Sequence, residues 1–284
     1  MRAPGEMEMV RIDDVIEESS IISTILFSPR HISRWSHLVP GQFLMVWIPG
    51  TDEVPMSVSH FRREPFRMGF TVQDIGEATR ALCSMKSGSR IGIRGPYGYG
   101  FKLPVKEEKD LIIGVSGGVG AASTILPMEW ASSEGYRTMN LVGARDSSLL
   151  LFRDRWEDIS ERVQYSTDDG SIGHHGLVTD LLLDVLRKLT EKERKRTMVF
   201  TCGPEVMMAA LLKVVEQFDV DAQFSLERFM KCGIGVCDSC SMSGKRVCMD
   251  GPVFAREEVA GLKEFGVSHR DRSGRIIPLK ECVR

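Results

Sequence analysis

A group of cysteines near the carboxyl end most constrains how this chain can fold. Residues 231–253 read KCGIGVCDSCSMSGKRVCMDGPV and hold four of the seven cysteines. These four, Cys232, Cys237, Cys240 and Cys248, have the spacing C-x4-C-x2-C-x7-C. The first three have the spacing that holds a [2Fe–2S] cluster, in which each iron takes two thiolates. The sequence therefore predicts that this segment wraps around an iron–sulfur centre.

The residues between the first two cysteines bear on the alternative, a structural zinc site, which also takes four cysteines. Gly233 and Gly235 have no Cβ, so a loop containing them can approach a sulfur atom closely. Zinc sites usually present two C-x2-C pairs on separate turns. Here a single C-x2-C follows a glycine-bearing C-x4-C, which favours iron–sulfur over zinc.

Length and composition indicate a globular protein of two domains with a small third. The 284 residues are 42% hydrophobic and 27% charged, and the formal net charge is -2. A net charge this close to zero produces no overall electrostatic attraction to nucleic acid or to an anionic membrane. The sequence shows no apolar run near the roughly 20 residues that cross a bilayer, and its start has no secretory h-region. The sequence thus predicts neither nucleic-acid nor membrane binding.

The odd number of cysteines, four of them grouped, indicates a reducing cytoplasm rather than a disulfide framework. Cys83 and Cys282 have no evident partner, and we expect them to be small buried or incidental thiols. The predicted localisation is therefore cytoplasmic.

Residues 1–102 predict an antiparallel β-barrel. Short β-type runs bounded by Gly, Pro, Asp or Ser recur along this region, as in barrels and sandwiches. They cover residues 10–19, 23–29, 41–50, 53–60, 67–74 and 90–98. A helix is expected at Gly76–Met85, between the last two runs.

Residues 103–222 predict a doubly wound α/β domain with a parallel sheet. The continuously apolar run LIIGV begins a series in which short strands alternate with helices. Leucines and valines between Leu177 and Leu189 recur at offsets of three and four, which indicates a helix packed on the core. The charged run 191–196 is expected to be a solvated loop. Residues 223–284 predict a small third domain ordered by its metal ligands.

Three predicted strand ends carry polar or glycine-rich residues suited to a nucleotide. Gly117, Gly118 and Gly120 lie between a strand and a helix, where backbone N–H groups can bind a pyrophosphate. The motif is not a strict G-x-G-x-x-G, so a tight turn that binds nothing stays open on this ground alone. In open parallel sheets, ligands bind outside the carboxyl ends of the strands.

The two further strand ends lie at residues 167–171 and 201–205 and favour the nucleotide site. Asp168 and Asp169 can accept hydrogen bonds from ribose hydroxyls. Cys202 and Gly203 offer a small side chain and bare backbone beside a flat ring, and we assign Cys202 to catalysis. No convincing acid–base dyad or G-x-S-x-G nucleophile elbow accompanies them.

At these residues the chain resembles the ferredoxin–NADP reductase superfamily, in which a barrel binds flavin and an α/β domain with a C-G-x-x motif binds the nicotinamide nucleotide. Residues 201–204 (TCGP) match that motif. Residues 54–57 (VPMS) stand where the family has Arg-x-x-Ser or Arg-Pro-x-Ser, so the arginine is missing. Residues 76–79 (GEAT) correspond to the turn on the flavin pyrophosphate. The resemblance adds these cofactor-binding residues: Pro55, Met56, Ser57, Val58, Gly76, Ala78, Thr79 and Pro204.

Within the superfamily the chain is similar, over essentially its whole length, to electron-transfer subunits of NAD-dependent dihydroorotate dehydrogenases. Residues 227–237 (ERFMKCGIGVC) and 248–254 (CMDGPVF) carry this resemblance most specifically. It implies FAD, a [2Fe–2S] cluster and NAD as cofactors. It also implies a heterotetramer in which a partner subunit with FMN oxidises dihydroorotate in pyrimidine biosynthesis.

The sequence leaves two choices open. Arg145 and Asp146 both follow the second strand of the α/β domain, so the choice of NAD over NADP rests on the resemblance. Two other functions also stay open. One is a related reductase serving a ferredoxin, sulfite-reductase or hydrogenase-type partner, and the other is a zinc-stapled nucleotide-binding module without a redox role.

Overall fold

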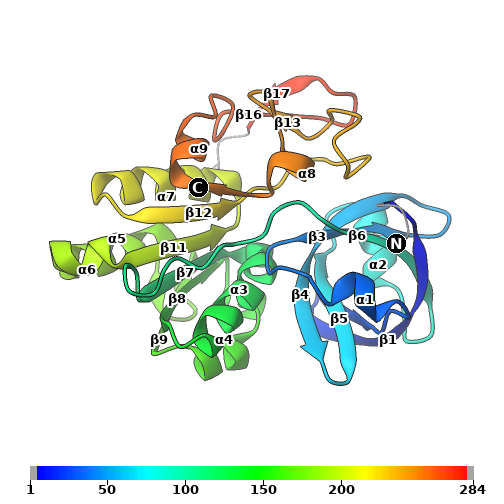
Figure 1. The fold of residues 1–284 in the computed structure, drawn as a ribbon, viewed down its shortest axis with the longest axis horizontal. Helices are drawn as coiled ribbons and strands as arrows, with labels where there is room; N and C mark the ends of the chain where they lie inside the picture. The colour runs from blue at the N-terminus through cyan, green and yellow to red at the C-terminus, as the bar shows by residue number, and fades with distance from the viewer. Residues whose placement is uncertain (1–4, 280–284) are drawn as a thin grey trace.

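The computed structural model describes residues 5–279, which form a barrel, a sheet covered by helices, and a C-terminal region (Figure 1). Cys282 lies outside the described residues. The barrel stands beside the sheet, and the C-terminal region lies above the junction of the two in the view of Figure 1. The division into domains at residues 102 and 222 stays a prediction.

The barrel predicted for the amino-terminal region is confirmed. Its strands close in the order β1-β2-β5-β4-β3-β6, and each neighbouring pair is antiparallel. Val10 and Ile12 are buried on β1 while Met9 and Arg11 face outward, which is the alternation expected of a barrel strand. The strands are β1 (Glu8–Ser19), β2 (Ile22–Phe27), β3 (Phe43–Trp47), β4 (Glu53–Arg63), β5 (Phe66–Gln73) and β6 (Arg90–Tyr97), with short helices α1 (Ile32–Trp35) and α2 (Glu77–Cys83).

The predicted parallel sheet is also confirmed, with one antiparallel strand at its edge. The strand order is β10-β9-β8-β7-β11-β12-β15, and only β15 runs against its neighbour. The chain order reverses between β7 and β11, and ligands bind at such a switch point in open α/β sheets. The strands are β7 (Leu111–Gly117), β8 (Arg137–Ala144), β9 (Arg162–Thr167), β10 (His174–His175), β11 (Thr197–Cys202), β12 (Asp221–Ser225) and β15 (Val253–Ala255).

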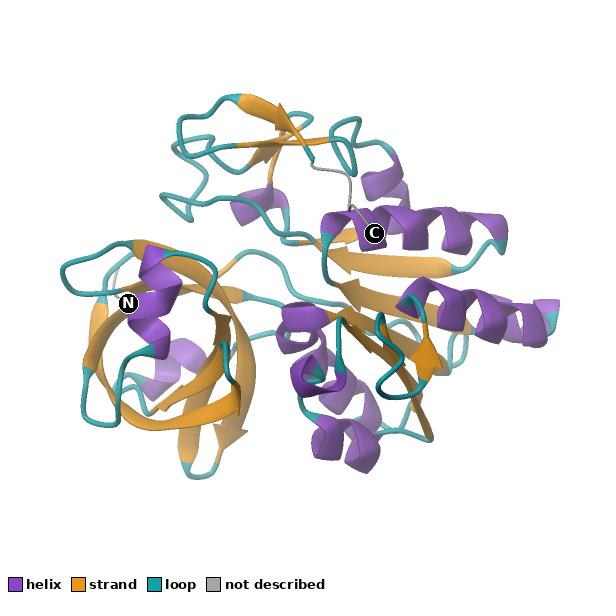
Figure 2. Ribbon diagram, turned by 180° about the vertical axis from the view of Figure 1, so that it is seen from behind, coloured by secondary structure: helices purple, strands orange, loops and turns teal. Residues whose placement is uncertain are grey.

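Helices cover both faces of the sheet, as Figure 2 shows. Helices α3 (Ala121–Ser133) and α4 (Arg153–Ile159) contribute to one core, and α5 (Val178–Lys188) and α7 (Glu205–Gln217) to another. The predicted stripe on α5 is buried in its middle, where Leu181, Leu182, Val185 and Leu186 belong to the core, whereas Leu177 before the helix is exposed. Among residues 5–279, no helix is both long and apolar enough to cross a membrane.

The expectation of a loop at residues 191–196 is wrong, because Glu191–Lys195 form the short helix α6. The Thr190 hydroxyl accepts a hydrogen bond from the Glu193 amide at 3.3 Å, and the Glu193 carboxylate accepts one from the Thr190 amide at 2.8 Å. This reciprocal capping box starts a helix even where no apolar stripe is present. The signal was in the sequence as Thr-x-x-Glu.

The C-terminal region combines sheet edge and loop. Strand β12 crosses the boundary predicted at residues 222 and 223, and β15 extends the sheet beyond it. Residues 226–240 contain neither helix nor strand. The remaining elements are short: β13 (Ser241–Met242), β14 (Lys245–Arg246), α8 (Val247–Asp250), α9 (Arg256–Ala260), β16 (Ser268–Arg270) and β17 (Ile276–Pro278).

Candidate functional site

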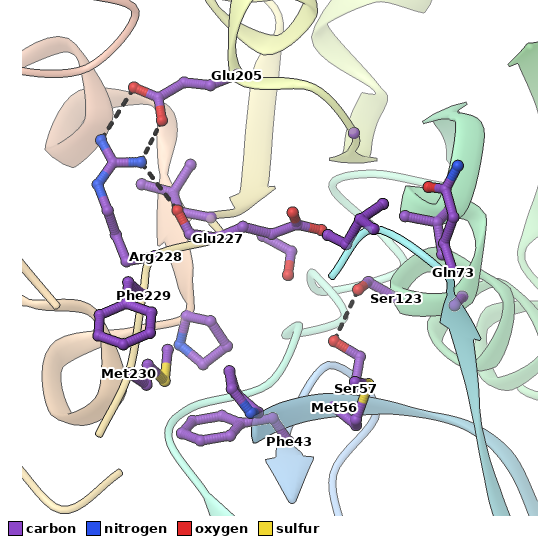
Figure 3. A pocket seen from close by; sticks show the side chains of 18 of the residues that line it. Phe43, Met56, Ser57, Gln73, Ser123, Glu205, Glu227, Arg228, Phe229 and Met230 are labelled. Atoms are coloured by element: carbon purple, nitrogen blue, oxygen red, sulfur yellow. Dashed lines mark hydrogen bonds and ion pairs between the residues drawn. The ribbon is translucent and has the colours of Figure 1, made fainter. Parts of the chain in front are cut away.

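A cleft of about 580 Å³ lies where the barrel, the sheet and the C-terminal region meet (Figure 3). This volume is in the range of small-molecule and cofactor sites. Its walls include residues of β4 and β5, the start of α3 and of α7, and the segment from Ser225 to Met230. The cleft therefore joins the region predicted to bind flavin with both other regions.

The barrel wall contains part of the predicted flavin site. Pro55, Met56 and Ser57 line the cleft from β4, and Thr79 lines it from α2. The Ser57 hydroxyl accepts a 2.8 Å hydrogen bond from Ser123 of α3, which ties the barrel to the nucleotide side. Val58 does not line the cleft, because its side chain is 1% exposed in the barrel core.

The predicted pyrophosphate turn is closed by its own threonine. The Thr79 hydroxyl accepts hydrogen bonds of 3.0 Å from the amides of Ile75 and Gly76. Ala78 is buried against the barrel, so it can contribute to a ligand only through its backbone. Val54, where the superfamily has an arginine, brings no charge, and the arginines lining the cleft are Arg228 and Arg270.

The glycine turn and the C-G-P turn meet at the switch point of the sheet. A Cβ added to Gly120 would stand 2.5 Å from the carbonyl oxygen of Cys202, and one on Gly203 would stand 3.0 Å from the amide nitrogen of Gly117. Glycine is needed here because bare backbones touch. Gly203 lines the cleft, whereas Gly117 and Gly118 stand beside it without lining it. The structure thus brings these predicted residues together.

Asp168 and Asp169 lie apart from this contact. They are exposed after β9, two strands from β7, and do not line the cleft. The Asp169 carboxylate accepts a hydrogen bond from the Ser171 amide at 2.9 Å, and this interaction with Ser171 lowers its pKa. They share the ligand-binding edge of the sheet with the glycines, and their contact with a ribose stays a prediction.

Cys202 is fully buried at the end of β11. Burial raises the pKa of its thiol to about 12, and the nearby Glu227 carboxylate adds to the shift. At neutral pH the side chain is therefore a neutral thiol rather than a nucleophile or base. The chemistry it offers is a small uncharged surface at the switch point.

A charged group in the cleft was not assigned from the sequence. Arg228 donates from both terminal nitrogens to the Glu205 carboxylate, and its side chain is only 4% exposed. The Gly266 amide donates to the same carboxylate at 2.7 Å. This ion pair fastens the start of α7 to the C-terminal region, because a buried guanidinium and carboxylate need each other.

Glu227 lies next to this pair and is displayed in the cleft in Figure 3. Its side chain is exposed to the cleft, yet the surrounding protein atoms raise the pKa of its carboxyl, the negative Glu205 raises it further, and Arg228 opposes both effects. Glu227 and Arg228 open the run 227–237 that carries the resemblance, but their contacts with Glu205 and with the cleft depend on the fold and have no signal in local sequence. Glu227 places a carboxyl group near Cys202.

The cysteine loop, residues 232–248, turns backbone amides toward its sulfur atoms. The amides of Ile234 and Val236 donate to Cys232 Sγ at 3.5 and 3.3 Å, and the Gly235 amide donates to Cys248 Sγ at 3.2 Å. Gly233 and Gly235 both have positive φ, at 69° and 74°. The glycines thus allow the close wrapping that the sequence predicts.

The sulfur atoms fall into two pairs, Cys232 with Cys237 and Cys240 with Cys248. For Cys237, hydrogen bonds from Ser239 and Cys232 outweigh the effect of burial and lower the pKa to about 6. The interaction with Cys248 lowers the pKa of Cys240 to about 7, and the same interaction raises the pKa of Cys248. The thiolate, the form that binds metal, is therefore favoured at Cys237 and Cys240.

The arrangement in two pairs fits an iron–sulfur cluster. A two-iron cluster takes two thiolates per iron and so needs pairs. The donor set therefore fits the cluster, and the identity of the four ligands stays a prediction.

Comparisons with known proteins agree with this site. A family model for the iron–sulfur cluster binding domain of dihydroorotate dehydrogenase B matches residues 227–260. A probable dihydroorotate dehydrogenase B (NAD(+)) electron transfer subunit of Methanocaldococcus jannaschii is 39% identical over 94% of this chain and 96% of its own length. The protein of the same description from Methanocella arvoryzae is 42% identical over 93% of this chain and 96% of its own length.

Solved structures show the same architecture. An NADH-dependent reduced ferredoxin–NADP oxidoreductase structure is similar with a TM-score of 0.76 and 27% identity, over 88% of each chain. A ferredoxin–NADP+ reductase from Neisseria gonorrhoeae, with 18% identity and a TM-score of 0.62 over 76% of this chain and 92% of its own, shows the fold alone. The class is thus a ferredoxin–NADP reductase-like oxidoreductase with an added iron–sulfur segment. Within it, the chain belongs to the family of dihydroorotate dehydrogenase B electron transfer subunits.

Proposed function

We propose that this chain passes electrons from dihydroorotate oxidation, in a partner subunit with FMN, to NAD in pyrimidine biosynthesis. The partner and this chain would form a heterotetramer in the reducing cytoplasm. The observation that carries the proposal is the shared cleft, which has the predicted flavin strand, the C-G-P turn and the approach to the cysteine loop in its walls.

The cofactors define the work that the residues must do. When bound, a [2Fe–2S] cluster carries single electrons and FAD links them to the two-electron hydride chemistry of NAD. Pro55, Met56 and Ser57, which line the cleft from β4, would orient the flavin ring. The cysteine loop would supply four thiolates, and the neutral Cys202 would leave room for a flat ring at the switch point.

Apolar side chains in the cleft wall support the transfer of a hydride. Met208 and Leu226 line the cleft together with Gly203 of the C-G-P turn. Preference for NAD over NADP rests on the family. The Asp146 carboxylate accepts a 2.8 Å hydrogen bond from the Ser148 amide, so it also stabilises the turn that follows β8.

One second function is favoured by a specific observation. The likeness to an NADH-dependent reduced ferredoxin–NADP oxidoreductase covers 88% of this chain. A related reductase serving another electron-carrying partner would share the barrel, the sheet and the cysteine loop. Only the partner separates the two functions.

Reconstitution tests the proposal. The full chain would be loaded anaerobically with FAD and iron–sulfur and mixed with the FMN-containing dihydroorotate dehydrogenase subunit from the same source. NADH formation from dihydroorotate and NAD⁺ is expected only when both chains are present. A chain that exchanges electrons between NADH and dyes but never couples to dihydroorotate would leave the cofactors in place and overturn the partner.

A further inference from the structure

Arg94 is a buried cation on the face of the barrel nearest the cysteine loop. It lies on β6 with a side chain only 11% exposed. Its Nε and Nη2 donate to the two oxygens of Glu53 at 2.5 and 2.6 Å. This bidentate geometry is rigid and charge-assisted, so the guanidinium is held in one orientation.

The remaining edge of the guanidinium points out of the barrel. Its Nη1 donates to the backbone carbonyl of Cys232 at 2.7 Å and to the Tyr97 hydroxyl at 3.3 Å. Arg94 and Cys232 are 138 residues apart in the chain. A barrel side chain therefore holds the residue predicted to be the first metal ligand, through the carbonyl of that residue.

A second contact, between Gly233 and Met45, fixes the same part of the cysteine loop against the barrel. A Cβ added to Gly233 would stand 2.7 Å from Met45 Cγ on β3. In the barrel register, Met45 pairs with Arg94 on one side and with Pro55 on the other. A short path through two neighbouring strand pairs thus connects the cysteine loop with the strand predicted to bind flavin.

We propose that Arg94 is a positioning residue that fixes the cysteine loop against the barrel and tunes the reduction potential of the centre that the loop holds. The inference rests on the proposed function, since it needs a cluster and a flavin. Outer hydrogen bonds orient metal ligands, and nearby charge sets cluster potentials. The Glu53 carboxylate binds the guanidinium on the side away from Cys232. The positive guanidinium is therefore closer to the predicted cluster than the negative carboxylate is.

Three variants separate this role from folding. Arg94→Gln combined with Glu53→Gln removes the cation without leaving a buried carboxylate unpaired, which alone would destabilise the barrel. Arg94→Lys keeps the charge and loses the bidentate geometry. Arg67→Gln is the matched control, because Arg67 is a barrel arginine whose ion pair with Asp14 is partly exposed and 3.7 Å long.

The measurements use the full chain loaded with FAD and iron–sulfur. An anaerobic redox titration followed by electron paramagnetic resonance gives the midpoint potential of the cluster. Rapid mixing with NADH gives the rate of cluster reduction after the flavin is reduced. NADH-to-dye activity reports the flavin alone.

The double variant is expected to keep FAD and dye activity. Its cluster potential is expected to fall, since the positive member of the Arg94–Glu53 ion pair is nearer to the added electron than the carboxylate that is removed with it. We expect its cluster reduction to slow by about tenfold, the lower end of the range for outer-shell changes at metal sites. Arg94→Lys is expected to restore the potential more than the rate, and Arg67→Gln is expected to match the unaltered chain.

Two results would overturn the inference. One is a double variant with the potential and rate of the Arg67→Gln control. The other is joint loss of FAD and cluster in both Arg94 variants, which would make the residue a support of the barrel fold only. An unaltered chain that binds no cluster would instead overturn the proposed function, so the two failures are distinguishable.

Discussion

The two halves of the site are held in different ways. At the sheet edge, Ser116 and Cys202 are paired in the register of β7 and β11, so regular hydrogen bonding brings the glycine turn and the C-G-P turn together. In the cysteine loop, residues 232–240 have no regular structure, and only the short β13, β14 and the start of α8 follow them. The shape of the loop comes from amides on sulfur and from contacts with the barrel at Arg94 and Met45.

This difference has a consequence for mutation. A residue at the sheet edge acts through a fold that is buried and continuous, so we expect its replacement to change the predicted nucleotide site without affecting the loop. A residue of the loop acts through its own ligation and a few contacts. The two functions should therefore be separable by single substitutions.

Cys237→Ser should give the largest effect. Cys237 is exposed, and its side chain is outside the buried cores of the sheet and the barrel. Loss of one of four thiolates should abolish the cluster and all electron transfer that depends on it, while NADH-to-dye activity through FAD stays largely intact. Visible and paramagnetic resonance spectra, with a dye assay, measure both. Equal loss of the two activities would show that the loop simply supports the fold.

Gly120→Ala should give the reverse pattern. The added Cβ would meet backbone atoms of Cys202 and Gly203 at 2.5 and 2.6 Å, so the switch point must open. We expect NADH-to-dye activity to fall by about tenfold or more, since small misplacements at a reacting centre are costly, and the cluster spectrum to persist.

Gly261→Ala is the matched control for this change. A Cβ added to Gly261 would stand 3.4 Å from its nearest neighbour, and the φ of Gly261 is an ordinary -78°. This substitution should therefore leave both the NADH-to-dye activity and the cluster spectrum unchanged. Full dye activity in Gly120→Ala would contradict the rigid switch point.

His60→Gln should give the smallest effect, at the joint between the barrel and the helices of the sheet. Arg155 contacts His60 at 3.1 Å and binds Glu129 at 2.8 Å. Burial, then the charges of Arg155 and Arg67, lower the pKa of His60 from 6.5 to about 3. The folded protein therefore keeps this imidazole neutral while the unfolded chain protonates it.

The sign follows from that difference. Above pH 6.5 both states are neutral, and as the pH falls toward 3 only the unfolded state takes the proton, so stability is lost. The slope is at most about 1.4 kcal/mol per pH unit for one proton. Denaturant unfolding just below pH 6.5, above the range of most carboxylates, should show a weaker pH dependence in His60→Gln. If the free energy of unfolding of His60→Gln kept the same pH dependence, the neutral His60 would not contribute to the stability of this contact.

Much of the fold could be predicted because it depends on local sequence patterns. Alternating strands, the buried run at Leu111 and the leucine stripe of α5 each follow from a short window of sequence. The extension of the sheet by β15 could not be predicted this way. Three residues carry almost no periodic signal, and their place depends on pairing with β12, some thirty residues earlier in the chain.

The site divides in the same manner. The cysteine spacing and the C-G-P turn are local motifs. The structure brings the C-G-P turn against the glycine turn and places the cysteines in two pairs. Long-range partners were not foreseen, because Arg94 and Cys232, or Glu205 and Arg228, meet only once the chain has folded. Asp168 and Asp169 follow a strand at the same edge of the sheet but do not line the cleft. A position at the end of a strand therefore does not by itself place a residue in the binding cleft.

Anaerobic rapid mixing of the reconstituted chain with NADH tests the central claim, that electrons pass between the cleft beside the C-G-P turn and the cysteine loop that follows the cleft segment Ser225–Met230. Flavin absorbance should fall first and the cluster signal should change next, in the same molecules. In Cys237→Ser only the flavin phase should remain. Flavin reduction that never reaches an intact cluster, even with excess NADH and added low-potential mediator as a check on the cluster, would contradict a single electron path through this chain.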